Sequence, residues 1–128
     1  MSKPKVHRLG DLQLKIMKVL WDRREATVAS VHEALGAESN LAYTTIATML
    51  RKMEVRGLVR HHNEGRSFVY QPTVAAEAVT RSMADHLLDR FFEGSLANMV
   101  SHLLTSREVS RDELAQLELL IDQRKKKL

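Results

Sequence analysis

Apolar residues recur at intervals of three and four along most of this chain, which predicts a series of amphipathic helices. In the first half, the spacing predicts helices over about residues 11–23, 28–36 and 43–56. Thr27 is the expected N-cap of the second helix and Gly36 its expected end, with a linker over residues 37–40. The expected core-facing residues of the three helices are Leu12, Ile16, Val19, Leu20, Val28, Val31, Leu35, Ile46, Met49, Leu50 and Met53.

After Gly57, which is expected to end the third helix, the pattern changes to short runs of strand-forming residues. Residues 58–62 and 67–70 predict two strands, and residues 63–66 predict the turn between them. Phe68 and Tyr70 should share one face of the second strand, which Pro72 ends. Three helices followed by a basic hairpin indicate a winged helix-turn-helix domain over residues 1–72.

The second half shows no strand pattern and predicts three further helices over residues 73–128, the last beginning at a Ser110–Glu113 capping box. Their apolar stripes are too broad to be covered within about 55 residues, so we expect a second copy of the chain to bury them. A compact monomeric three-helix domain is the alternative. The residues expected at the dimer interface are Val79, Met83, Leu87, Phe91, Leu96, Met99, Val100, Leu103, Leu114, Leu117 and Ile121.

The net charge of +4 hides a division along the chain. Residues 1–72 carry twelve Lys and Arg against seven Asp and Glu, which gives +5, whereas residues 73–123 carry four against nine, which gives −5. This asymmetry would turn the first half toward a polyanion. Charge alone fits DNA, RNA or an anionic membrane surface.

The polar face of the third helix carries the candidate DNA contacts. Short side chains allow close approach to base edges, and the free N–H groups at a helix start favour phosphate. We expect base contacts from Thr44, Thr45, Ala47, Thr48 and Arg51, with Tyr43 beside them, and phosphate contacts from Lys52, Arg60 and Arg66. An ordinary solvated helix face is the alternative.

Several classes of function are disfavoured. The chain has no Cys, and its His residues are scattered, with His61 and His62 on opposite faces of a strand, so we expect no metal or cofactor. A pH effect on the wing through either His is a further hypothesis. No Gly-rich phosphate loop, GxSxG step or carboxylate cluster indicates an enzyme. No apolar run approaches the ~20 residues of a membrane span, and no signal peptide is evident, so a cytoplasmic protein is expected.

Short motifs in order along nearly the whole chain follow one family pattern: LGDL at 9–12, IMKVLW at 16–21, TV at 27–28, VHE at 31–33, YTTIATML at 43–50, RGL at 56–58, GRSFVYQP at 65–72 and FEGSL at 92–96. Together they resemble the penicillinase repressor family, the BlaI/MecI-type winged-helix repressors. The resemblance implies a homodimer that occupies palindromic operators before β-lactamase-type resistance genes.

The resemblance also implies release by a sensor-protease system that cleaves the helical dimerisation part. The family's Asn-Phe scissile step corresponds to His102-Leu103 in this chain, so the protease specificity or the release mechanism is expected to differ. The related copper-responsive repressors carry a C-terminal Cys cluster, which this chain does not have. A helical adaptor that binds another protein, and a winged-helix regulator of unrelated genes, are the alternatives.

Overall fold

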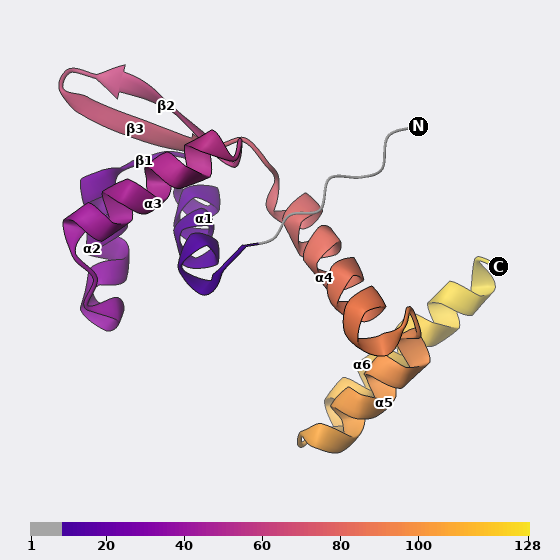
Figure 1. Ribbon diagram of the computed structural model, residues 1–128. Coiled ribbons are helices and arrows are strands. Elements are labelled where there is room, and N and C mark those ends of the chain that lie inside the picture. The colour runs from indigo at the N-terminus through magenta and orange to yellow at the C-terminus, as the bar shows by residue number, and fades with distance from the viewer. Residues whose placement is uncertain (1–8) are drawn as a thin grey trace. The chain divides into compact units, whose positions relative to one another are not determined.

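The computed structural model describes residues 9–128, the side chains of residues 37–39 excepted. The chain packs as two compact units that divide after Ala84. Its elements, labelled in Figure 1, are α1 (Asp11–Arg23), β1 (Ala26–Thr27), α2 (Val28–Ser39), α3 (Tyr43–Val55), β2 (Val59–Glu64), β3 (Ser67–Pro72), α4 (Ala76–Phe92), α5 (Leu96–Ser106) and α6 (Arg111–Lys126). The expected class, mainly α with a winged helix-turn-helix and a small β-hairpin, is confirmed.

The predicted stripes of α1 and α3 form the centre of the first unit. Ile16 and Leu20 of α1 and Ile46, Leu50 and Met53 of α3 are fully buried, while Met49 is partly buried against the same cluster. Met17, which lies between the predicted positions of the α1 stripe, is also fully buried. Both helices are thereby held by their apolar backs.

The second helix is longer than expected. Thr27 caps it as predicted, because its hydroxyl accepts the N–H of Ser30 at 3.1 Å. The prediction that Gly36 ends the helix is wrong: Gly36 lies inside α2, and the predicted linker over residues 37–40 is mostly helical. The helix ends at Asn40, which adopts a left-handed conformation and donates its N–H to the Gly36 carbonyl. Asn tolerates the left-handed conformation that ends a helix, and a Gly inside a helix costs only about 1 kcal/mol. The helix therefore continues through Gly36 and ends at Asn40.

The sheet has three antiparallel strands in the order β1-β3-β2. The predicted hairpin is confirmed but is longer than expected, because Asn63 and Glu64 pair with Phe68 and Ser67. Only Gly65 and Arg66 remain in the turn, and Gly65 has a φ of +61°. The sequence did not predict β1, whose two residues pair with Tyr70 and Val69 of β3.

The start of α4 packs with the winged helix. The indole N–H of Trp21 donates to the Val74 carbonyl at 2.9 Å, and Val79 is only 1% exposed. Val79, expected at a dimer interface, is therefore covered within its own chain. The two compact units divide within α4, after Ala84. The expected boundary between functional domains after Pro72 is a different statement, and it stays a prediction.

The second unit contains the end of α4 with α5 and α6. Ser95 caps α5, and the Ser110 hydroxyl accepts the N–H of Glu113 at the start of α6, which is one of the two hydrogen bonds of the predicted capping box. No described residue of α5 or α6 is buried. Among the described residues, no helix is both long enough and apolar enough to traverse a bilayer.

Candidate nucleic-acid interface

The start of α3 leaves backbone N–H groups for a ligand. Ala42 occupies the N-cap position and its methyl group cannot accept a hydrogen bond, so among the described residues no side chain caps the N–H groups of the first turn. Thr44 and Thr45 in this turn are exposed, whereas Ile46 is buried beneath them. The helix therefore presents polar side chains and the positive end of its dipole on the same outward surface.

The turn between α2 and α3 is braced by His32. Its Nε2 lies 2.8 Å from the Leu41 carbonyl and donates to it, and its ring meets the Tyr43 ring edge to face at 6.0 Å. His32 thereby fixes the chain where α3 begins. The sequence does not predict this role, because the partners of His32 lie in the loop and on the following helix.

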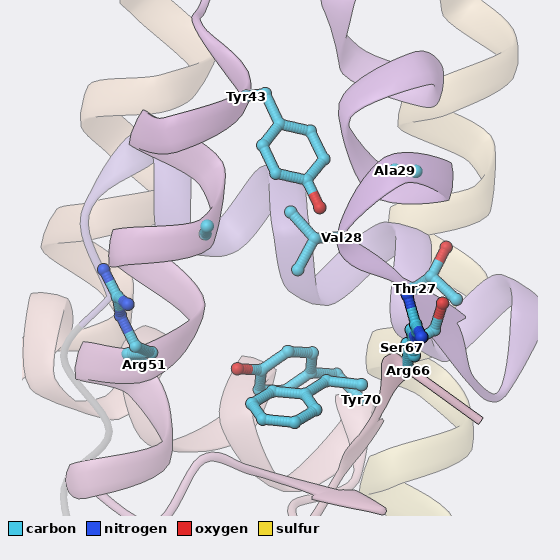
Figure 2. A pocket seen from close by; sticks show the side chains of 10 residues that line it. Thr27, Val28, Ala29, Tyr43, Arg51, Arg66, Ser67 and Tyr70 are labelled. Atoms are coloured by element: carbon cyan, nitrogen blue, oxygen red, sulfur yellow. The ribbon is translucent and has the colours of Figure 1, made fainter. Parts of the chain in front are cut away.

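A cleft of about 300 Å³ separates α3 from the wing, the hairpin formed by β2 and β3. From α3 it receives Tyr43, Ala47 and Arg51, which are spaced by four residues and so share one helix face. Figure 2 shows Arg51 and Arg66 on opposite sides of this cleft, with the Tyr70 ring between them. The remaining lining residues are Thr27, Val28, Ala29, Ser67 and Phe68.

Four of the predicted DNA contacts, Tyr43, Ala47, Arg51 and Arg66, thus line one cleft. Thr44, Thr45, Thr48 and Lys52 lie on the same helix, α3, whereas Arg60 lies on β2. Thr48 is half-buried, and its hydroxyl accepts a hydrogen bond of 3.2 Å from Arg51, which orients that guanidinium. Lys52 is exposed on the next turn of α3. The α3 positions therefore form one continuous polar surface.

Arg60 is engaged within the protein. Its Nε donates to Gln71 Oε1 at 3.2 Å, and the Gln71 amide donates to Glu25 at 2.9 Å. Arg60 and Gln71 are cross-strand partners, so both lie on the hairpin face opposite to His61. A phosphate contact by Arg60 would have to use the guanidinium nitrogens that this chain of bonds leaves over.

Tyr70 is the buried polar residue of the cleft. Its burial raises the pKa of the phenol, the nearby Glu54 carboxylate raises it further, and Arg51 lowers it in part. The Tyr70 hydroxyl therefore stays protonated and neutral at physiological pH.

Six residues that line the cleft were not among the predicted DNA contacts, namely Thr27, Val28, Ala29, Ser67, Phe68 and Tyr70. Thr27 was assigned only as a cap, although capping places the start of α2 at this surface. Ser67 was recognised only as a strand residue. Its position beside the turn that carries Arg66 was the available signal.

Among the described residues, no group of three His, Asp or Glu side chains could hold a metal ion. The arrangement is suited to a different chemistry: an apolar-backed helix with hydroxyl and basic side chains outward, flanked by a hairpin with a basic turn. These features define a winged-helix DNA-binding protein.

The chain belongs to the penicillinase repressor family, whose model matches residues 9–123. It is 31% identical over 121 residues to the penicillinase repressor of Bacillus licheniformis, covering 94% of each chain. It is 36% identical over 121 residues to the transcriptional regulator BlaI of Mycobacterium tuberculosis, covering 89% of this chain and 88% of that protein.

Two solved structures are similar to the winged-helix part. The solution structure of the BlaI DNA-binding domain has a TM-score of 0.52 at 33% identity, and the match covers 59% of this chain and 93% of that one. The monomeric form of Bacillus licheniformis BlaI in complex with the blaP half-operator has a TM-score of 0.50 at 34% identity, covering 58% and 90%. The chain is accordingly a DNA-binding transcriptional repressor and not an enzyme.

Proposed function

We propose that this repressor acts as a homodimer, in which each subunit inserts α3 into the major groove at one half of a palindromic operator. The observation that supports this most strongly is the outward polar surface of α3, uncapped at its N-terminus and held from behind by buried Ile46 and Leu50. A related BlaI has been solved on a half-operator. A two-fold dimer would present two such helices to a symmetric site.

Within that proposal, base edges are contacted by Thr44, Thr45, Ala47, Thr48 and Arg51. The Ala47 methyl offers an apolar contact to a thymine methyl, and the hydroxyls supply hydrogen bonds. Lys52, Arg66 and the remaining nitrogens of Arg60 meet phosphates, while Tyr43 lies at the edge of the surface. Phosphate contacts would dominate affinity and its salt dependence, and base contacts would add specificity.

The proposed dimer interface is the apolar surface of the second unit. Leu96, Val100, Leu104 and Ile121 line an open, mainly apolar groove of about 600 Å³ between α5 and α6. Because no residue of α5 or α6 is buried within one chain, a second copy has large side chains to cover. The further proposed interface residues of the second unit are Leu87, Phe91, Met99, Leu103, Leu114 and Leu117, and Met83 of the first unit is proposed with them.

We propose that a signal releases the operator by weakening this dimer, through proteolysis or another route. His102-Leu103 lies within α5, where the Thr105 hydroxyl donates to the carbonyls of Ser101 and His102. A protease could cut there only after the helix opens locally. Mixing the purified repressor with extract from antibiotic-treated cells, followed by mass spectrometry of the fragments, identifies any cleaved bond.

The regulated genes are proposed to be β-lactamase-type resistance genes, since one relative is named a penicillinase repressor. Selection of bound fragments from the source genome, followed by sequencing, tests the whole proposal. We expect a palindromic consensus upstream of such genes. A palindrome upstream of other genes would support the regulator of unrelated genes, and no enrichment at all would favour a helical adaptor.

A further inference from the structure

We propose that Glu54 and His61 form a latch that holds the wing against α3 and thereby delivers Arg66 to the DNA backbone. The inference rests on the proposed function, because it assumes that α3 and the wing contact DNA together. Neither residue is expected to touch DNA. Both are positioning residues.

The Glu54 carboxylate, near the C-terminal end of α3, binds the wing strand β2 at two points. Its oxygens lie 2.7 and 2.8 Å from Nδ1 of His61, and Oε2 also accepts the backbone N–H of His61 at 3.2 Å. The two residues are seven positions apart, across the turn at Gly57 that ends the helix. One side chain therefore fixes both the ring and the backbone of the first wing strand.

The His61 ring is also held from the second wing strand. Phe68 stacks on it with ring centroids 4.3 Å apart and planes inclined by 21°, and Tyr70 lies tilted at 5.4 Å. Of the groups that face His61, Glu54 comes from α3 and both aromatic rings come from β3, while Arg51 acts on Tyr70. The side chains of His61 and Glu54 are 29% and 31% exposed, so the pair is partly shielded from solvent.

The latch acts where the hairpin leaves the body of the domain, and Arg66 lies at the far turn. A change in the angle at His61 is therefore carried along the strands to Arg66. His62, the next residue, provides a matched comparison. It faces the other side of the hairpin, is more exposed, and among the described residues forms an ion pair with Glu64 of its own strand at 3.4 Å.

Electrostatics and the latch predict changes of opposite sign in operator affinity when the Glu54 carboxylate is removed. Removing the Glu54 carboxylate takes a negative charge away from a surface that approaches a polyanion, which by charge alone should strengthen binding. The latch predicts the opposite result, because the wing loses its anchor. Operator affinity should fall, and the salt slope should drop by about 1 as the Arg66 phosphate contact is lost.

The experiment measures operator affinity against salt for the full-length wild type, Glu54→Ala, Glu54→Gln, His61→Gln and the control His62→Gln, each with and without Arg66→Ala. Thermal unfolding checks that every variant is folded. We expect Glu54→Ala and His61→Gln to bind more weakly, and Arg66→Ala to cost much less in those backgrounds than in the wild type. Glu54→Gln, which keeps an acceptor oxygen, should retain most of the affinity, and His62→Gln should leave the Arg66→Ala penalty unchanged.

The latch is overturned if Glu54→Ala binds as well as the wild type or better, or if Arg66→Ala costs the same factor in every background. If Glu54→Ala does not fold, His61→Gln provides the same comparison. A wild type that ignores the operator would contradict the proposed function itself, because the latch can be judged only against a wild type that binds.

Discussion

At the scale of residues, α3 and the wing carry two kinds of proposed DNA contact that substitutions can distinguish. Thr45 is exposed on the first turn of α3, where a hydroxyl can meet a base edge, whereas Arg66 lies in the wing turn and carries a charge. Base contacts change with sequence and phosphate contacts do not. The two residues should therefore fail in different ways.

We predict that Thr45→Ala lowers operator affinity by about 1–3 kcal/mol while leaving random-sequence binding nearly unchanged. Arg66→Ala should weaken both and reduce the salt slope by about 1. Fluorescence anisotropy with operator and random duplexes at several salt concentrations measures both quantities. If Thr45→Ala lowers the affinity for both duplexes equally, Thr45 does not contact a base edge.

Tyr70 makes stability sensitive to alkaline pH. Its pKa is raised above the ordinary 10.0, first by burial and then by Glu54, so the folded state keeps a proton that the unfolded state loses. The contribution is fully present below pH 10 and declines as the pH rises through the folded pKa. The free energy of unfolding should fall above pH 10.

Tyr70→Phe removes this titration, so its stability should fall less steeply than that of the wild type over the same range. Urea unfolding at a series of pH values provides the comparison. The two proteins differ only at residue 70, so the difference between the two curves isolates the contribution of Tyr70. Parallel curves would show that the phenol ionises as easily in the folded protein as in the unfolded chain.

At the scale of elements, the sequence predicts helices whose apolar residues repeat over several turns. It does not predict very short elements, or helix ends at which two residues could each stop the helix. The stripes of α1 and α3 gave those helices nearly to the residue, because buried residues such as Ile16 and Leu50 must repeat with the helix period. A two-residue strand such as β1 has no period to detect. The predicted end of α2 at Gly36 is wrong, because the helix continues to its C-cap residue Asn40, which adopts the left-handed conformation.

The candidate site was predictable to a similar extent. Exposed polar positions on α3 follow from its buried stripe, so Tyr43, Thr45 and Arg51 were available from spacing alone. The cleft against the wing and the Glu54–His61 pair were not, because they depend on the angle at which the hairpin leaves Gly57. Contacts between elements require the fold itself.

The wing turn gives a prediction at this scale. Gly65 has a φ of +61°, where a Cβ would meet no neighbouring atom but would strain the backbone. Gly65→Ala should destabilise the protein by about 1–2 kcal/mol, whereas Gly65→Asn should cost less because Asn tolerates this conformation. Thermal unfolding of both variants tests the difference. Equal stabilities would place the strain elsewhere.

At the scale of the whole molecule, the proposed function requires a second copy of the chain. The second unit exposes large apolar side chains along α5 and α6, including Leu96, Leu120 and Ile121. Burying one such side chain stabilises the dimer by about 1.5–3 kcal/mol. Each contact occurs twice in a two-fold dimer, once from each subunit. Dimerisation would also place two α3 helices on one operator.

Ile121→Asp and Leu119→Asp form a matched test of that interface. The two residues lie on α6 and are 53% and 58% exposed, but only Ile121 lines the groove against α5. We expect Ile121→Asp to raise the dimer dissociation constant by at least about 100-fold and Leu119→Asp to leave it nearly unchanged. Analytical ultracentrifugation measures both. Equal effects, or a wild type that stays monomeric at high concentration, would contradict the proposed groove interface.

A hydroxyl-radical footprint of the full-length protein on its selected operator tests the central proposal most directly. Two α3 helices held by one dimer should protect two equivalent half-sites, with centres separated by about 10–10.5 base pairs or a multiple of that spacing. A single protected half-site at saturation, or protection that does not depend on sequence, would contradict the account.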